Sequence, residues 1–180
     1  MSEDHKKALE KSLWAIADSL RGKLSGDEYR DYILGFIFYK YLSEKIELYA
    51  DSILISDGLK FKDLEENDKE QKQIVEAVRE ESVIKLGYFL KPSELFSNIA
   101  KRGHIEDDEQ YNDDEEKETR FILEDLGKIL NNIQQSTMGT DSEEDFDNLF
   151  EDIDLNNSKL GRTTEQRNRT VSKILTKLDE

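Results

Sequence analysis

The chain contains no cysteine, one proline and two histidines among its 180 residues. Without cysteine there is no disulfide framework, no thiolate metal site and no cysteine nucleophile. His5 and His104 are too far apart in sequence to suggest a metal-binding pair. No two glycines form a G-x-G pattern, which excludes a Gly-rich phosphate loop of the Rossmann type, and a Pro-Pro motif cannot occur. We therefore expect no catalysis, bound cofactor or metal in this chain alone.

Long apolar runs are also absent. No uncharged stretch is long enough to span a bilayer, and residues 1–12 lack the apolar segment of a signal peptide. These two absences predict a chain that makes no contact with a membrane, and the lack of cysteine fits a cytoplasmic protein.

Positive charge is scarce, since 26 Lys and Arg residues face 42 Asp and Glu residues and give a net charge of −16. The phosphate backbone of DNA repels so acidic a chain, which argues against autonomous DNA binding. The same number of acids leaves a different function open, in which the chain imitates DNA and acts as an acidic inhibitor.

The apolar pattern is strongest between residues 9 and 49, where it predicts two helices joined by a short turn. Steps of three and four place one set of side chains on a single face of the first helix. The set consists of Leu9, Leu13, Ala17, Leu20 and Leu24, widened by Trp14 and Ile16. The second helix opens with a capping box, in which the Ser25 hydroxyl accepts from the Glu28 amide and the Glu28 carboxylate accepts from the Ser25 amide.

An uncharged run of eight residues, 32–39, lies within this second helix. By itself the run is compatible with a buried strand. Charged residues continue a helical pattern on both sides of it, and the whole segment is too long for an ordinary strand. We therefore predict one long helix that is packed on most sides at its middle.

Apolar periodicity elsewhere predicts further helices. The expected ranges are 68–84, 92–101, 121–133 and 141–154, followed by a last helix that starts at a Thr163–Gln166 capping box and runs through Leu178. A short extended segment is expected near 86–91, before Pro92. The predicted fold class is all-α, a bundle of about six helices in a single domain over 1–180.

The segment 104–118 breaks the helical pattern. It holds nine acids against Lys117 alone. Self-repulsion and the lack of buriable apolar surface predict a mobile acidic loop.

The sign of the charge reverses near the end of the chain. Between Leu155 and Leu178 six basic residues face one acid, Glu165. The turn 160–164 adds backbone amides, hydroxyls and a helix N-terminus, which all suit anions. Two interpretations remain open, a solvated helix face and a contact with phosphate or a protein partner. The candidate contact residues are Arg21, Lys23, Lys159, Arg162, Arg167, Arg169 and Lys173.

Three stretches carry a resemblance to a known family. They are residues 9–22 (LEKSLWAIADSLRG), residues 34–43 (LGFIFYKYLS) preceded by Glu28 and Tyr29, and residues 150–161 (FEDIDLNNSKLG). Together they resemble the N-terminal helical domain of the modification subunit of type I restriction–modification systems.

The resemblance implies a full subunit that is an S-adenosylmethionine-dependent DNA adenine N6-methyltransferase. Its catalytic domain would follow residue 180, so no catalytic or cofactor-binding residue can be assigned here. It also implies a specificity subunit, a second modification subunit, a restriction subunit and double-stranded DNA as partners. The helical domain would help to assemble the complex and to close a clamp around DNA. Two alternatives stay open, a helical protein–protein adaptor and the acidic DNA mimic.

Overall fold

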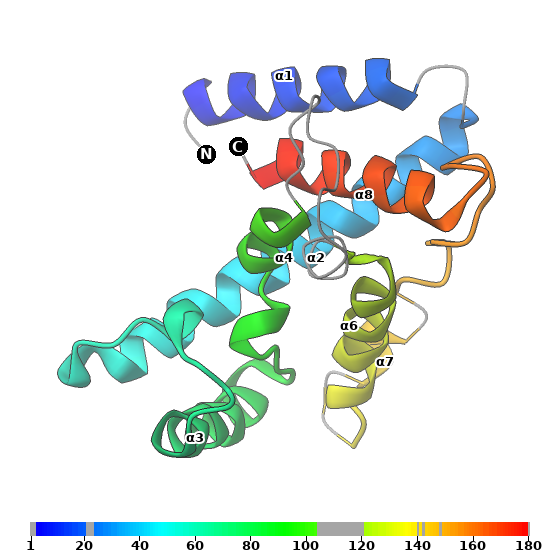
Figure 1. Cartoon of the computed structure of the whole chain (residues 1–180). Coiled ribbons are helices and arrows are strands. Elements are labelled where there is room, and N and C mark those ends of the chain that lie inside the picture. Colours follow the sequence, from blue (N-terminus) through cyan, green and yellow to red (C-terminus); the bar gives the residue numbers. More distant parts are fainter. Residues whose placement is uncertain are drawn as a thin grey trace. The chain divides into compact units, whose positions relative to one another are not determined.

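The structure is a computed structural model, and it describes residues 3–20, 24–103, 121–139, 141, 143–147 and 149–179. These residues form six α-helices of eight residues or more, one four-residue helix and three short 3₁₀ segments, with no strand (Figure 1). The helices are α1 (Glu3–Leu20), α2 (Gly26–Leu54), α3 (Lys69–Leu86), α4 (Phe96–Gly103), α6 (Leu123–Ser136), α7 (Glu143–Phe146) and α8 (Thr164–Asp179). The all-α class is thereby confirmed.

The chain divides into two compact units. The first unit comprises Met1–Ile37, Ala100–Asp125 and Asp152–Glu180, and the second comprises Phe38–Ile99 and Leu126–Glu151. The single domain expected over 1–180 stays a prediction. The predicted acidic loop 104–118 lies outside the described residues.

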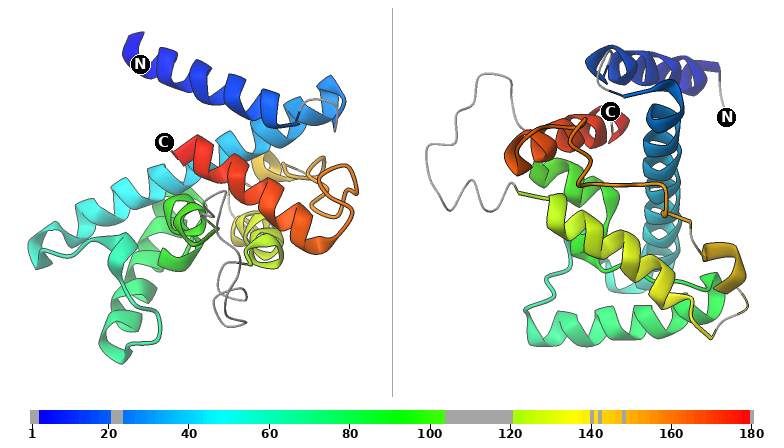
Figure 2. Two further views of the ribbon diagram at one scale, coloured as in Figure 1. Left: turned by 45° about the horizontal axis from the view of Figure 1, so that its top comes forward. Right: turned by 90° about the vertical axis from the view of Figure 1, so that its right-hand side faces the viewer.

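In the first unit α1 lies alongside α8 (Figures 1 and 2). Its core is made of large apolar side chains that are at most 5% exposed: Ile16, Tyr32, Ile33, Phe36, Ile122, Leu160, Val171, Ile174 and Leu175. Burying each of the aliphatic and phenylalanine side chains stabilises the fold by roughly 1.5–3 kcal/mol. The apolar face predicted for the last helix is therefore the one that the structure buries.

Both predicted capping boxes of the first unit are present. The Ser25 amide donates to the Glu28 carboxylate at 2.9 Å, and the Glu28 amide donates to the Ser25 hydroxyl at 3.3 Å. In the second box the Gln166 amide donates to the Thr163 hydroxyl at 3.2 Å. Each box satisfies backbone donors that a helix start leaves free.

The structure contradicts the prediction that Trp14 belongs to the buried face of α1. Trp14 was expected to widen that face, but it is 70% exposed, whereas Ile16 is fully buried. Each residue of a helix turns by about 100°, so side chains two residues apart point to nearly opposite sides. Trp14 and Ile16 therefore cannot share one face.

The second unit is built around the aromatic residues of α2. Tyr39 packs against Phe96 with ring centroids 5.2 Å apart, and its hydroxyl donates to the Glu94 carbonyl at 2.6 Å. The Tyr88 hydroxyl donates to the Leu42 carbonyl at 2.8 Å. The run 32–39 is helical throughout, as predicted. These bonds satisfy the polar ends of tyrosines whose rings lie in the core.

The third predicted helix is confirmed as α3, with its first turn capped by Asp68. The Asp68 carboxylate accepts from the Glu70 and Gln71 amides, both at 2.9 Å. Gly87 closes the helix in the left-handed region at φ 83°. Residues 88–91, which follow, form neither helix nor strand, in agreement with the short extended segment predicted there.

Two predicted helices are shorter than expected. The segment 92–101 is divided into a 3₁₀ turn, Pro92–Glu94, and α4, because Leu95 between them is extended. The Phe96 amide at the start of α4 donates to the Ser43 hydroxyl at 2.7 Å. This cap comes from α2 and replaces the local start that Pro92 was expected to provide.

The segment 141–154 forms α7 over only four residues, with turns at 149–152. The Leu149 amide donates to the Phe146 carbonyl at 3.3 Å, a bond that tightens the chain after α7. Phe146 and Phe150 both lie 6.4 Å from the ring of Phe38, measured between centroids. The apolar face therefore docks as predicted, but through a turn.

Among the described helices, none combines the length and the apolarity that crossing a membrane requires.

Candidate functional site

Three of the predicted contact residues line one hollow of the first unit, at the turn before α8. The hollow has a volume of about 730 Å³ and is called the basic hollow below. Its lining residues are Ser158, Lys159, Leu160, Gly161, Arg162, Gln166, Arg169 and Thr170. Sequence reasoning named the basic members of this set, and the structure brings Lys159, Arg162 and Arg169 together.

The backbone of the turn is held against the first turns of α8. Leu160 is buried, and its carbonyl accepts from the Thr170 hydroxyl at 2.7 Å. Gly161 sits so close to α8 that an added Cβ would lie 2.6 Å from the Arg167 backbone nitrogen. Because backbone atoms cannot yield as a flexible side chain can, this position requires glycine. The backbone that lines the hollow is therefore held in a fixed position against α8.

Two of the backbone amides expected to face an anion, those of Arg162 and Thr163, are already bonded. The Gln166 side-chain oxygen accepts from the Arg162 amide at 2.9 Å and from the Thr163 amide at 3.4 Å. The Gln166 amide is used by the capping box described above. These amides are therefore not available to an anion, and side chains at the turn remain as ligands.

Lys159 is paired within the chain. Its ammonium nitrogen lies 2.8 Å from both carboxylate oxygens of Glu28, at the start of α2. The hydrogen bond from Lys159, followed by those from Ser25, lowers the pKa of Glu28 to about 2. The carboxylate is therefore ionised at neutral pH, and it balances the charge of Lys159.

Arg167 is also engaged by the fold. Its guanidinium donates to the Gly161 carbonyl at 3.4 Å and to the Thr164 hydroxyl at 3.0 Å, and the residue is half-buried. Lys173 is half-buried on α8 as well. Arg167 therefore holds the turn against α8 more than it presents charge to a ligand.

Arg162 and Arg169 differ from the other candidates. Both are exposed, and the guanidinium of neither makes a hydrogen bond or ion pair with any described residue. The remaining candidates, Arg21 and Lys23, lie outside the described residues. The charge that this face offers to a ligand is thus concentrated on two arginines.

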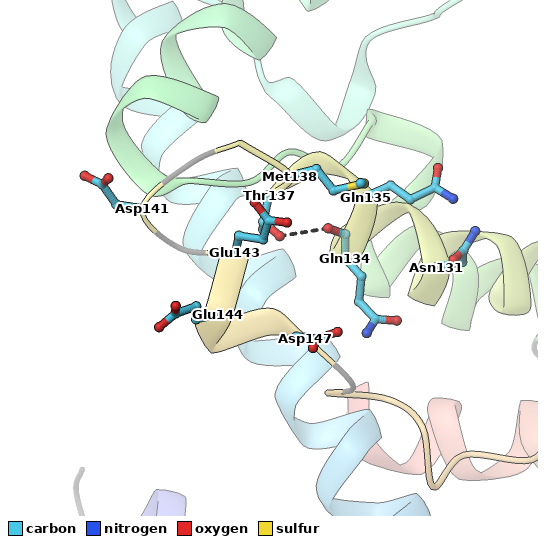
Figure 3. A pocket seen from close by; sticks show the side chains of 9 residues that line it. All are labelled: Asn131, Gln134, Gln135, Thr137, Met138, Asp141, Glu143, Glu144 and Asp147. Carbon is cyan, nitrogen blue, oxygen red and sulfur yellow. Dashed lines mark hydrogen bonds between the residues drawn. The ribbon is translucent and has the colours of Figure 1, made fainter.

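A second hollow, in the second unit, was not anticipated from the sequence. It has a volume of about 680 Å³ and lies at the turn between α6 and α7 (Figure 3). Its lining residues are Asn131, Gln134, Gln135, Thr137, Met138, Asp141, Glu143, Glu144 and Asp147.

Several of these polar groups hold the turn itself. The Glu143 carboxylate accepts from the Gly139 amide at 2.8 Å, and the Gln134 amide group donates to the Phe146 carbonyl at 3.2 Å. The Thr137 hydroxyl donates to the Gln134 carbonyl at 2.7 Å, the bond drawn in Figure 3. Within the part of the chain that the structure describes, no group of three or more His, Asp or Glu residues is placed to hold a metal ion. The second hollow is lined mainly by polar side chains that hold the turn between α6 and α7.

Comparison with known proteins gives three consistent findings. The family profile described as the HsdM N-terminal domain matches residues 9–178. The methylase subunit of the type I restriction enzyme MpnII from Mycoplasma pneumoniae is 31% identical over 178 residues, which cover 98% of this chain and 31% of that protein. The crystal structure of a type I restriction-modification system methyltransferase subunit from Streptococcus thermophilus superposes with a TM-score of 0.69. It is 28% identical and covers 96% of this chain and 34% of that one. The chain thus spans about a third of the length of these relatives.

Proposed function

The chain belongs to the family of HsdM N-terminal domains, found in the methylase subunit of type I restriction enzymes, and from this premise we propose that it assembles the methyltransferase and contacts DNA as part of a clamp. In this proposal the full subunit is a site-specific DNA adenine N6-methyltransferase that uses S-adenosylmethionine. Methyl transfer belongs to polypeptide outside these 180 residues. The partners are a specificity subunit, a second modification subunit, a restriction subunit and double-stranded DNA, in the cytoplasm.

The proposal of a DNA contact rests on the two exposed arginines that line the basic hollow. Arg162 and Arg169 line the same hollow, and neither guanidinium is bonded to a described residue. Arginine binds phosphate oxygens through charge-assisted hydrogen bonds. Lys159, by contrast, is already paired with Glu28, so the two arginines are the charges of this hollow that remain available to phosphate.

The net charge of −16 fixes the conditions under which this contact forms. Free in solution, the chain is repelled by DNA at distances within a Debye length, about 8 Å at physiological salt. Two arginines do not overcome that repulsion by themselves. The contact therefore depends on partner subunits that hold the domain against the duplex.

The test replaces both arginines in the assembled methyltransferase with its partner subunits. We expect Arg162→Gln with Arg169→Gln to weaken DNA binding and to reduce the slope of log K against log salt by about 1.8, since each lost phosphate contact removes about 0.9. The measurement is DNA affinity by fluorescence anisotropy across a salt series.

The matched control is Lys69→Gln with Lys72→Gln, which removes two exposed positive charges from α3. It should leave the slope unchanged. An equal slope for the arginine variant and the wild type would instead favour a helical adaptor that makes no DNA contact.

A further inference from the structure

The basic hollow holds a third cation, Lys159, whose charge is paired within the chain. The Lys159 ammonium nitrogen lies 2.8 Å from each of the two carboxylate oxygens of Glu28. Glu28 belongs to the first turn of α2, whereas Lys159 lies 131 residues later, in the turn before α8. A pair between such distant parts of the first unit either supports the turn or controls the charge that the hollow offers.

Other bonds hold the turn in place without this pair. Before Lys159, the Asp154 carbonyl accepts from the hydroxyl of Tyr32, a buried residue of α2. After Lys159, the Leu160 carbonyl accepts from the Thr170 hydroxyl of α8 at 2.7 Å. These bonds lie on both sides of Lys159, so its backbone stays in place when its side chain changes partner. The pair is therefore not required to position the turn.

The two side chains of the pair are accessible enough to exchange partners. The Lys159 side chain is 51% exposed and the Glu28 side chain is 30% exposed. An ion pair with this exposure contributes little to stability, because water and dissolved ions compete for both charges. A lysine ammonium sits on a flexible stem of four carbons and also binds phosphate oxygens. Lys159 can therefore contact phosphate once Glu28 no longer holds it.

The charge on Glu28 counts against a DNA contact in two ways. It cancels the charge of Lys159, and it places a negative group beside the position that a phosphate would take. The carboxylate also keeps this charge at neutral pH, since the bonds from Lys159 and Ser25 lower its pKa to about 2. Of the three cations that line the hollow, only the two arginines are thus left for DNA.

We propose that Glu28 masks Lys159 as a third phosphate ligand of the basic hollow, and that loss of the Glu28 charge releases Lys159 to DNA. This inference rests on the DNA contact proposed above and deepens it by naming a residue that limits the contact. With Glu28 in place, the hollow offers DNA two cations in place of three. The masked lysine weakens the contact further and increases its dependence on the partner subunits.

Glu28→Gln tests the proposal in the assembled methyltransferase with its partner subunits. Glutamine keeps a side-chain oxygen for the Ser25 amide, so the start of α2 retains its cap, while the charge that holds Lys159 is removed. We expect the slope of log K against log salt to become steeper by about 0.9, the value of one added phosphate contact. DNA affinity at about 0.1 M salt should rise roughly five- to tenfold. The measurement is fluorescence anisotropy across a salt series.

Lys159→Gln shows whether the released lysine causes the gain. Combined with Glu28→Gln, it should return the slope to the wild-type value, because the third cation is then absent. Alone, it should leave the slope unchanged and weaken binding, because the Glu28 charge is then unpaired beside the phosphate. A slope that Lys159→Gln alone reduces by about 0.9 would mean that Lys159 already contacts DNA in the wild type, and it would overturn the proposal.

Asp27→Asn is the matched charge control. It removes an acid from the same turn of α2, and its partner Arg30 keeps a second carboxylate, that of Asp31, at 3.2 Å. This variant should keep the wild-type slope. An equal effect of Glu28→Gln and Asp27→Asn, or a loss of affinity with Glu28→Gln, would overturn the proposal. Either result is distinct from failure of the DNA contact itself, in which the double arginine variant keeps the wild-type slope.

Discussion

The Glu28 carboxylate makes two structural interactions in the first unit. It caps the start of α2 through the Ser25 amide at 2.9 Å and also holds Lys159 at 2.8 Å. Both bonds favour the ionised carboxylate, and the pKa of Glu28 falls from 4.5 to about 2 as a result. One side chain thus fixes a helix start and one wall of the basic hollow.

The lowered pKa of Glu28 gives a pH dependence of known sign. A carboxylate whose pKa is lower in the folded state contributes stability above its unfolded pKa, and the contribution is lost as the pH falls through the folded value. We expect Glu28→Gln to lower the melting temperature at pH 7, and the difference from wild type to shrink between about pH 4.5 and pH 2. The measurement is thermal unfolding followed by circular dichroism at a series of pH values.

Asp27→Asn is the matched control for that series. Asp27 is exposed in the same turn of α2, and among the described residues it forms an ion pair with Arg30 alone, at 3.3 Å. Its difference from wild type at pH 7 should be small, because an exposed ion pair contributes little to stability. A constant difference for Glu28→Gln across the series would show that its ionised form is not specially stabilised.

At the scale of elements, the sequence predicts helix starts whose partners are local. The boxes Ser25–Glu28 and Thr163–Gln166 could be predicted because their members are three residues apart. The start of α4 could not, since its cap, Ser43, lies 53 residues before Phe96. The start of α6 is capped in the same non-local way, by Asn168 on α8, which lies 46 residues after Ile122. Non-local caps leave no periodic signal, which is why the boundaries of these two helices were wrong by a few residues.

Asn168 shows how much one such cap contributes to stability. It is buried, and its side-chain oxygen accepts from the Ile122 amide at 2.9 Å and from the Leu123 amide at 3.1 Å. Asn168→Ala leaves two donors without that acceptor, so we expect the free energy of unfolding to fall by roughly 2–4 kcal/mol. Chemical denaturation followed by tryptophan fluorescence or circular dichroism measures the change.

The control for Asn168→Ala is Asn131→Ala, at an exposed position on α6. A surface substitution of this kind should change stability by no more than about 0.5 kcal/mol. Equal, small effects of the two substitutions would mean that water replaces the Asn168 oxygen at the start of α6.

At the scale of the whole molecule, the candidate surface was only partly predictable. Spacing identified Lys159, Arg162 and Arg169 as one basic group, and the basic hollow contains all three. Spacing could not show that Glu28, 131 residues away in sequence, neutralises Lys159, or that Arg167 folds back onto the Gly161 carbonyl. Charge content is a property of sequence, whereas the availability of each charge is a property of packing.

The same net charge of −16 predicts how the stability of the chain responds to salt. Like charges held together in a folded chain repel one another, and the repulsion weakens as the Debye length shortens from about 10 Å at 0.1 M to about 3 Å at 1 M. We expect the melting temperature of the isolated chain to rise when sodium chloride is raised from about 0.05 to about 0.5 M.

Tetramethylammonium chloride at equal ionic strength is the control, because general screening predicts the same rise for both salts. A rise with sodium alone would indicate specific cation binding, and a fall with both would mean that ion pairs such as Lys159–Glu28 outweigh the repulsion of the acids. An equal rise with both salts would show that repulsion among the excess acidic residues destabilises the folded chain.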